Sequence, residues 1–253
     1  MATAPRATKS RLDQLLVETG QFDSRAKAQA AVMAGLVFVK GQRVDKPGQQ
    51  VAADAAIEVK GKAHPYVSRG GLKLAKAIEH FGIDCAGKLG LDVGASTGGF
   101  TDVLLRAGAA KVYAVDVGHN QLAWSLRSDP RVVVMEKTNA RHLTRELVPE
   151  PVDLVVCDAS FIGLETVLPA AMALAAPGAW LVALIKPQFE VGPDRVGKGG
   201  IVRDPALHQE VCDRIARWLA AQPDWSVAGI QPSPIEGADG NREFLIAGRL
   251  GAI

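Results

Sequence analysis

The sequence context of Lys186 suggests a catalytic role more strongly than that of any other residue in this chain. It directly follows the apolar run 181–185, so the base of its side chain is expected to be buried. Burial disfavours a charged ammonium group, and a lysine in its neutral form can accept a proton as a general base. The alternative is an ordinary lysine at a strand end, whose ammonium group reaches solvent or an ion pair. A second lysine nearby would favour the neutral amine and nearby carboxylates would favour the charged one, so the sequence leaves both alternatives open.

Carboxylates and a second lysine occupy comparable positions elsewhere. Asp158 follows the apolar run 152–157, and Glu243 immediately precedes the last apolar run. Lys73 lies in a segment with helical spacing, in front of the first apolar run of the larger part of the chain. In an open sheet of parallel strands, ligands bind beyond the carboxyl ends of the strands. The sequence therefore predicts a cluster of lysines and carboxylates that positions a polar substrate.

A glycine-rich loop, 92–100, joins the apolar run 89–93 to a segment with helical spacing. Glycines permit positive φ and close approach of a ligand, and a helix start leaves free N–H groups there. The spacing differs from the G-x-G-x-x-G of dinucleotide-binding proteins. Residues 94–98 fit the G-x-S-x-G turn of serine hydrolases, with Ser96 as the nucleophile. The whole loop fits the D-x-G-x-x-x-G-G pattern of methyltransferases that use S-adenosylmethionine.

Asp116 favours a nucleoside-bearing cofactor over a hydrolase. It ends the predicted strand 111–115, and an acid at the end of the second strand, roughly 20 residues after the loop, can hold ribose hydroxyls. A hydrolase would require an acid and a histidine later in the chain. His208 is present, but no acid at a convincing strand end stands out as its partner.

The elements that must position these residues alternate along the chain. The predicted strands are 89–93, 111–115, 132–135, 152–157, 179–185, 226–231 and 244–247, and the predicted helices are 72–81, 98–107, 121–126, 140–148, 164–176 and 205–221. Such alternation is typical of an α/β fold with a mostly parallel, Rossmann-like sheet covered by helices on both faces. The last two strands lack a helix between them, which predicts an antiparallel hairpin at the sheet edge.

Composition favours a cytoplasmic protein of one large and one small domain. The chain has 253 residues, of which 48% are hydrophobic. Its three cysteines are widely spaced and form neither a zinc pattern nor a disulfide framework, so a reducing compartment and no metal are expected. The N-terminus lacks the apolar core of a signal peptide. The uncharged stretch 166–185 is interrupted by Pro169, Pro177 and Gly178, so no membrane span is predicted.

Charge is unevenly distributed, although the net charge is only +2. Residues 1–76 carry an excess of Lys and Arg, and the remainder carries an excess of Asp and Glu. This basic part contains predicted helices at 11–20 and 25–34 and predicted strands at 36–39, 42–44 and 56–60. Ser24 is a good N-cap for the second helix, and Gly35 is placed to end it. A small basic domain predicts a polyanionic partner.

This order of elements resembles the S4 RNA-binding domain over residues 10–62. The resemblance rests on Ser24, Arg25, Ala28, Gly35, Val37, Val39, Gly41, Val44, Pro47, Gly48, Val51, Asp54 and Ile57. It implies that phosphates of structured RNA are contacted by Arg11, Arg25, Lys27, Lys40 and Arg43. Taken singly, each of these side chains is as consistent with a solvated surface charge. Ser68 and Arg69, after a linker, are further candidates for RNA contact.

Together with this domain, five segments resemble the TlyA family, which is related to the FtsJ/RrmJ methyltransferases. The segments are 68–74, 92–100, 153–161, 186–190 and 241–244. The family's Lys-Asp-Lys-Glu tetrad falls on Lys73, Asp158, Lys186 and Glu243, with Glu236 as a nearby alternative to the last. Some members carry the name haemolysin, but the sequence shows no amphipathic cationic helix, span or export signal that would suit a pore.

The resemblance implies S-adenosylmethionine-dependent 2′-O-methylation of a ribose, of cytidine, in ribosomal RNA. Lys186 would accept or stabilise the proton of the 2′-hydroxyl. The partners would be ribosomal RNA or ribosomal subunits, and the enzyme a monomer. The implied cofactor contacts are Asp92, Gly94, Ala95, Ser96, Gly98, Gly99, Phe100, Asp116, Val117, Asn139, Ala140 and Asp158.

The predicted organisation is a basic tail, 1–9, an S4-like domain, 10–62, a linker, 63–69, and a methyltransferase domain, 70–253. Two other functions stay open. One is an RNA-binding factor of ribosome assembly without turnover, and the other is the serine hydrolase that acts through Ser96.

Overall fold

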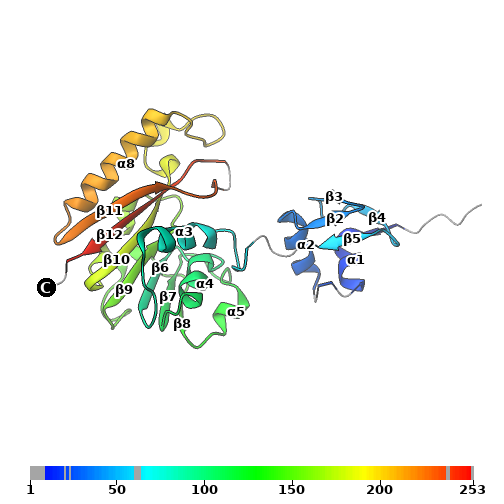
Figure 1. The fold of residues 1–253 in the computed structure, drawn as a ribbon, viewed down its shortest axis with the longest axis horizontal. Helices are drawn as coiled ribbons and strands as arrows, with labels where there is room; N and C mark the ends of the chain where they lie inside the picture. Colours follow the sequence, from blue (N-terminus) through cyan, green and yellow to red (C-terminus); the bar gives the residue numbers. More distant parts are fainter. Residues whose placement is uncertain (1–8, 20, 23, 60–63, 238–239, 252–253) are drawn as a thin grey trace, which may run out of the picture. The chain divides into compact units, whose positions relative to one another are not determined.

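The computed structural model describes residues 9–19, 21–22, 24–59, 64–237 and 240–251. The chain divides after Pro65 into two compact units, both drawn in Figure 1. The predicted basic tail lies outside the described residues except for Lys9, which is the first residue of a strand.

The smaller unit packs two helices against short strands. Its helices are α1 (Leu12–Glu18) and α2 (Arg25–Met33), and its strands are β1 (Lys9–Arg11), β2 (Val37–Val39), β3 (Gln42–Arg43), β4 (Gln50–Ala52) and β5 (Ile57–Val59). β1 pairs antiparallel with β4, and β2 lies between β3 and β5. Leu12, Leu16, Val32 and Val37 are fully buried in the core between these elements.

Local signals in this unit predict the boundaries of α2 well. The side chain of Ser24 accepts a hydrogen bond from the backbone N–H of Lys27, and Gly35 has a φ of 70° just beyond the helix end. The first helix begins later than predicted because Arg11 belongs to β1. Strands β1 and β4 were not predicted, since three residues give too little alternation to recognise.

The larger unit is built on a seven-stranded sheet in the order β11-β12-β10-β9-β6-β7-β8. The strands are β6 (Leu89–Val93), β7 (Lys111–Val115), β8 (Val132–Met135), β9 (Val152–Cys157), β10 (Ala175–Ile185), β11 (Trp225–Pro232) and β12 (Phe244–Leu250). Strands β6 to β10 pair in parallel, whereas β12 runs antiparallel to both β10 and β11. The predicted edge hairpin is confirmed.

Helices cover both faces of this sheet, as the alternation predicts. One hydrophobic cluster joins the sheet to α3 (Gly71–Phe81), α4 (Gly99–Arg106) and α5 (Trp124–Arg127). A second cluster joins the other face to α6 (Leu164–Val167), α7 (Pro169–Met172) and α8 (Pro205–Ala220). Figure 1 shows α8 alongside β11 and β12, and α3 and α4 on the opposite side. The strands of the centre are therefore buried on both faces, and polar groups gather at their ends.

Three predicted helices are wrong in extent. The segment 164–176 forms two short helices, because Pro169 has no N–H to continue the first and begins the second. Its last residues, Ala175 and Ala176, belong to β10, which has an irregular register where Gly178 has a φ of 79°. The helix predicted at 121–126 begins only at Trp124.

The third error concerns 140–148, which forms only the 3₁₀ turn η1 (Ala140–His142). Leu143 then turns to an extended conformation, and its side chain is buried, as is that of Val148. Burial of these two apolar residues overrides the helical spacing. The remaining short turns are η2 (Pro187–Phe189) and η3 (Pro193–Arg195). Among the described residues, no helix has the length and apolarity that a bilayer span requires.

Candidate active site

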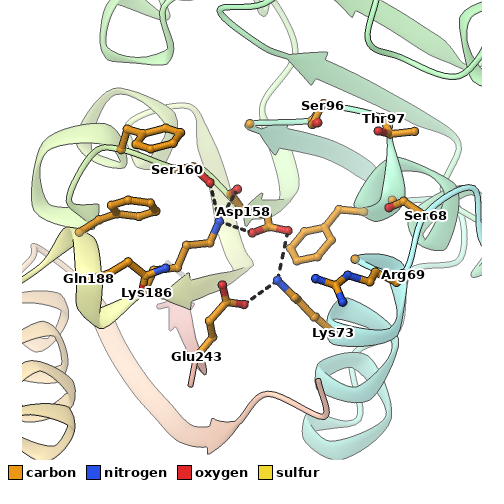
Figure 2. A pocket seen from close by; sticks show the side chains of 17 residues that line it. Ser68, Arg69, Lys73, Ser96, Thr97, Asp158, Ser160, Lys186, Gln188 and Glu243 are labelled. Carbon is orange, nitrogen blue, oxygen red and sulfur yellow. Dashed lines mark hydrogen bonds and ion pairs between the residues drawn. The ribbon is translucent and has the colours of Figure 1, made fainter. Parts of the chain in front are cut away.

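Lys73, Asp158, Lys186 and Glu243 lie together at one edge of the sheet (Figure 2). Lys73 comes from the first turn of α3, Asp158 follows β9, Lys186 follows β10, and Glu243 precedes β12. Because β12 runs opposite to its neighbours, its start lies at the same edge as the ends of the parallel strands. The predicted convergence is thus produced by four elements that are far apart in the chain.

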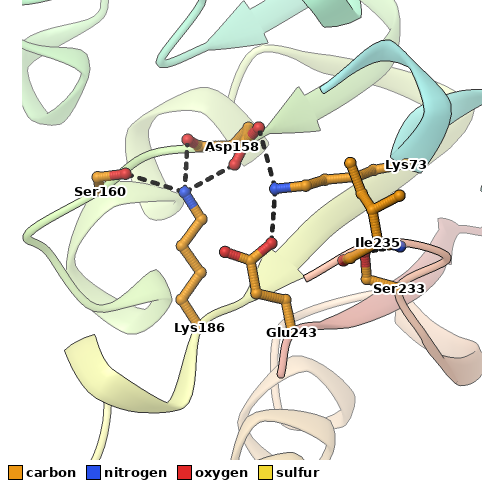
Figure 3. Close-up of polar contacts among 7 residues, drawn as sticks. All are labelled: Lys73, Asp158, Ser160, Lys186, Ser233, Ile235 and Glu243. Carbon is orange, nitrogen blue, oxygen red and sulfur yellow. Dashed lines mark hydrogen bonds and ion pairs between the residues drawn. The ribbon is translucent and has the colours of Figure 1, made fainter. Parts of the chain in front are cut away.

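Lys186 is held in one position by three contacts (Figure 3). Its Nζ lies 2.7 Å from Oδ1 of Asp158, and it donates to the Asp158 backbone oxygen at 3.0 Å and to Oγ of Ser160 at 2.9 Å. The side chain is only 8% exposed. A buried amine with a fixed set of acceptors has few rotamers to lose on binding a substrate, so it is suited to a precise position next to a reacting hydroxyl.

Lys73 and Glu243 complete an alternating row of charges (Figure 3). Nζ of Lys73 lies 2.5 Å from Oε2 of Glu243 and 3.8 Å from Oδ2 of Asp158. Both side chains of the closer pair are buried, whereas Glu236 is exposed. The geometry therefore places Glu243, and not Glu236, in the row. Two cations and two anions balance each other, which lowers the cost of burying them.

Two cavities adjoin this row of charges. One, of about 540 Å³, is lined by Lys73, Asp158, Lys186 and Glu243. The other, of about 420 Å³, lies over the ends of β6 and β7 and includes Asp116. Both cavities are lined by residues of two loops, which include Gly94, Ser96, Asp158, Ser160 and Phe161. The arrangement suits two ligands that meet across one wall, with Asp158 between them.

The structure separates the predicted cofactor residues into three groups. The cavity of about 420 Å³ is lined by Gly94, Ser96, Asp116, Val117, Asn139, Ala140 and Asp158. The cavity of about 540 Å³ is lined by Ala95, Gly99 and Phe100, as well as by Gly94, Ser96 and Asp158. Asp92 and Gly98 line neither cavity. Gly98 has a φ of 97° and packs under α5, where an added Cβ would lie 2.3 Å from Leu126, so both the turn and the packing require a glycine.

Backbone geometry explains why the loop after β6 needs a glycine at its first turn. Gly94 has a φ of 81°, and an added Cβ would lie 2.8 Å from the backbone of Ala159. The loops after β6 and β9 therefore touch at this residue. Ser96 also has a left-handed φ, of 48°, and its N–H donates to Asp116 at 2.7 Å. This contact ties the loop to the end of β7.

Asp116 and Asn139 are already engaged by the protein. The carboxylate of Asp116 accepts from the N–H of Ser96 and, at 2.7 Å, from that of Gly118, and each oxygen keeps a further lone pair for a ligand hydroxyl. The side-chain oxygen of Asn139 accepts from the N–H of Arg141 and so begins η1. The same oxygen also accepts from Nε of Arg141, so both of its lone pairs are used and the amide nitrogen is left to meet a ligand.

The Ser96 hydroxyl does not have the surroundings of a nucleophile. It contacts Oε1 of Gln121 at 3.2 Å, whereas Nε2 of His208 lies 2.8 Å from the backbone oxygen of Val202 in the buried contact between α8 and the loop before it. Serine hydrolases require the nucleophile and the base within hydrogen-bond reach of each other. The positions of Ser96 and His208 argue against the hydrolase.

The predicted RNA-contacting residues occur in both units. Ser68 and Arg69 line the cavity of about 540 Å³ in the larger unit. In the smaller unit, Arg11 and Arg25 form ion pairs with Asp13. Lys40 lies in the tight turn between β2 and β3, and the guanidinium group of Arg43 lies where a side chain at Gly35 would clash with it. Lys27 lies in the first turn of α2.

Several residues that line the larger cavity were not among the predicted site residues, among them Thr97, Phe161, Gln188 and Phe189. Phe161 is 89% exposed and has a φ of 65°, which is unfavourable for a bulky side chain. Its ring lies 4.9 Å from that of Phe189, and both line the cavity together with Gln188 and Thr97. Only the position of Phe161, three residues after Asp158 in the loop that follows β9, could have suggested it from the sequence.

Asp92 is completely buried, and its burial raises the pKa to about 7 even though Thr101 donates two hydrogen bonds to it. Since the pKa in the unfolded chain is about 3.9, the folded protein holds a proton on Asp92 that the unfolded chain releases between about pH 4 and pH 7. This contribution to stability is therefore lost as pH rises through that window. Asp92→Asn should remove this dependence on pH. The free energy of unfolding of the variant minus that of the native protein should therefore be larger at pH 8 than at pH 4, by up to about 4 kcal/mol.

Urea unfolding of both proteins at pH 4, 6 and 8 measures this difference. Asp84→Asn, at an exposed carboxylate, serves as the matched control and should give a difference that hardly changes with pH. A stability difference for Asp92→Asn that is equal at the three pH values would contradict the burial of an uncompensated carboxylate.

Comparison with known proteins agrees with this geometry. The model of the family described as FtsJ-like methyltransferase matches residues 66–250, and that of the S4 domain matches residues 10–57. A relative from Mycobacterium tuberculosis, the 16S/23S rRNA (cytidine-2′-O)-methyltransferase TlyA, is 48% identical over 95% of this chain and 90% of its own length. Hemolysin A of Brachyspira hyodysenteriae is 42% identical over 93% of this chain and 98% of its own length.

A solved structure from Streptococcus thermophilus, of a protein described provisionally as a hemolysin, is also similar. It has a TM-score of 0.75 and 42% sequence identity, and the likeness covers 97% of this chain and 90% of that one. Relatives of this chain therefore also contain both units.

Proposed function

The chain belongs to the TlyA family, whose members join an S4 domain to an FtsJ-like methyltransferase domain, and from this premise we propose that it methylates the 2′-hydroxyl of a ribose in ribosomal RNA. The observation that carries the proposal is the row of Lys73, Asp158, Lys186 and Glu243 at the wall between two cavities. One cavity suits a nucleoside-bearing methyl donor, and the other suits the acceptor nucleotide.

S-adenosylmethionine is the cofactor of this family, and it supplies an activated methyl group. The residues around the cavity of about 420 Å³ fit it. Asp116 has free lone pairs for ribose hydroxyls, and the left-handed turns at Gly94 and Ser96 bring loop backbone next to the cavity. The exposed apolar side chain of Val117 and the small buried Ala140 suit the faces of an adenine ring.

Lys186 is the residue proposed to take the proton of the acceptor hydroxyl, after its own ammonium group has released one proton and so gained a lone pair. Lys186 lines the acceptor cavity but not the cofactor cavity, and Asp158 and Ser160 fix the position of its Nζ. Asp158 faces both ligands and orients Lys186. Glu243 and Lys73 hold the row together and offer polar groups to the ribose and its phosphate. Most of the rate should come from the position of two reactants, which can be worth several kcal/mol.

The acceptor is proposed to be cytidine, as in the relative from Mycobacterium tuberculosis. Phe161 and Phe189 form an exposed aromatic surface at the cavity, and a nucleobase turned out of its stack gains from such a surface. Phe161 has a strained φ of 65°, and its ring is 89% exposed. We expect the base of the target nucleotide to stack on this ring.

Phe161→Ala should therefore lower kcat/KM for RNA by about tenfold to a hundredfold, since stacking of a base on an aromatic ring contributes roughly 1–3 kcal/mol. Phe161→Tyr should restore most of the activity. Because Phe161 lines both cavities, the affinity for S-adenosylmethionine should also fall in the alanine variant, so kcat/KM for RNA is compared at saturating S-adenosylmethionine. Leu147→Ala removes another exposed apolar side chain and serves as the control. Equal kcat/KM in the alanine variant and the native protein would show that the ring does not support the base.

Transfer of tritiated methyl groups to ribosomal RNA and to assembled subunits tests the proposed function directly. The expected RNA product resists alkaline cleavage next to each methylated ribose, and mapping of 2′-O-methyl groups identifies these positions. Removal of residues 1–65 should weaken RNA binding more than cofactor binding. RNA binding without any methyl transfer to RNA or subunits would instead support an assembly factor that lacks turnover.

A further inference from the structure

Asp13, the second residue of α1, is a carboxylate that is completely buried in the smaller unit. Its neighbours Leu12, Leu15 and Leu16 form the apolar core, and a charge among them is stable only if it is well paired. Asp13 is paired by two arginines from different elements. Arg11 reaches it from the end of β1, and Arg25 reaches it from the first turn of α2.

The contacts around Asp13 fix both guanidinium groups. Arg11 donates from Nε to Oδ1 and from Nη2 to Oδ2, each at 3.0 Å. Arg25 donates from Nε to Oδ2 at 2.9 Å, and Gln29 donates to the same oxygen at 2.7 Å. These bonds hold the pKa of Asp13 well below its usual range, chiefly through Arg11. The carboxylate is therefore charged at any physiological pH.

The two arginines keep outward-facing donors. Their side chains are 39% and 48% exposed, and Arg25 uses only Nε towards Asp13, which leaves both of its terminal nitrogens outside that contact. Gly48 provides room beside Arg11, because an added Cβ would lie only 3.2 Å from its terminal nitrogens. One carboxylate between two guanidinium groups leaves a net charge of about +1, with several N–H groups in fixed directions.

We infer that Asp13 is a positioning residue that presents Arg11 and Arg25 as one phosphate-binding site, and that its ligand is the backbone phosphate of structured RNA. The inference rests on the proposed RNA-binding function and adds how the two side chains act. Two fixed guanidinium forks bind an oxyanion with less loss of side-chain entropy than two mobile ones. Phosphate contacts of this kind set the register of RNA without reading its bases.

The substitution Asp13→Asn separates this role from a simple effect of charge. It removes a negative charge from a basic unit, so a uniform electrostatic effect would strengthen RNA binding. The positioning role predicts the opposite, a loss of about tenfold in affinity. Asp54→Asn makes the same charge change at an exposed residue of this unit and should leave the affinity equal or slightly higher.

The probe is a fluorescent RNA hairpin of mixed sequence, titrated with the full chain at several salt concentrations. Each lost phosphate contact lowers the slope of log affinity against log salt by about 0.7–0.9, so Asp13→Asn should reduce it by roughly one to two. In the Asp13→Asn background, Arg25→Ala should cost much less than in the native chain. Additive losses, or an affinity for Asp13→Asn as high as that of the native chain, would overturn the inference.

Two controls distinguish a loss of RNA contacts from a loss of folding. Thermal unfolding and cofactor binding of each variant test whether the fold is intact. If Asp13→Asn does not fold, Arg25→Lys, at a half-exposed side chain, keeps the charge but lacks the fork, and unchanged RNA affinity in it would overturn the inference. A native chain that does not bind the hairpin at all contradicts the RNA-binding function itself, whereas tight native binding with an unaffected Asp13→Asn variant contradicts only the role of Asp13.

Discussion

Lys186→Ala should abolish methyl transfer to RNA while leaving the affinity for S-adenosylmethionine intact. General base catalysis contributes typically about 10²–10⁴-fold, and the expected fall in kcat is in this range or beyond it. Cofactor binding should persist because Lys186 lines only the acceptor cavity. Single-turnover methyl transfer measures the rate, and titration calorimetry measures the cofactor affinity.

Lys186→Arg distinguishes a base from a fixed positive charge. A guanidinium group keeps the charge near Asp158 but does not lose a proton in proteins. If Lys186 accepts the proton, the arginine variant should be as inactive as the alanine variant. Lys88→Ala serves as the control, because Lys88 precedes β6 at the opposite end of the sheet. Retained turnover in either Lys186 variant would remove Lys186 from the role of base.

Asp158→Asn should have the second-largest effect on activity, and it should impair both methyl transfer to RNA and binding of S-adenosylmethionine. Its carboxylate lies 2.7 Å from Nζ of Lys186 and 3.8 Å from that of Lys73, so its loss leaves two cations against Glu243 alone. We expect turnover to fall by about 10²-fold or more, since Lys186 loses its orienting partner. The affinity for S-adenosylmethionine should also fall, because Asp158 lines both cavities.

Stability should respond to the same substitution. Breaking a buried ion pair costs about 3–5 kcal/mol, and the 21% exposure of the Asp158 side chain reduces the expected cost to roughly 1–3 kcal/mol. Asp153→Asn is the matched control, since Asp153 lies near the other end of the same strand and pairs with Lys88. Native cofactor affinity and native turnover in Asp158→Asn would show that the wall between the cavities does not need its charge.

The sequence was sufficient to predict the sheet and the convergence at its edge. Apolar runs of five or six residues identify buried strands, and parallel pairing then brings Asp158 and Lys186 to one side. The position of Glu243 was harder to predict, because it depends on the antiparallel direction of β12. The predicted hairpin implied that direction, but the short distance to Lys73 and the burial of Glu243 are what distinguish it from the exposed Glu236.

Other features depend on contacts between distant residues, which no local pattern specifies. Tertiary burial of Leu143 and Val148 cancels the helix predicted at 140–148. The pairing of Arg11 and Arg25 through Asp13 joins three elements that look unrelated in the sequence. The individual roles of the tetrad residues and of the cofactor contacts stay predictions that the experiments above address.

The Lys73–Glu243 contact joins residues 170 positions apart. Closure of such a long loop is entropically costly and is repaid only when the intervening sheet is in place. A ribosome that is still synthesising this chain therefore carries a site in which Lys73 lacks its closest carboxylate until the last strand has emerged and paired. The methyltransferase unit acquires its complete set of charges only at the end of its own folding, so any truncation before β12 should leave the nascent or degraded chain inert.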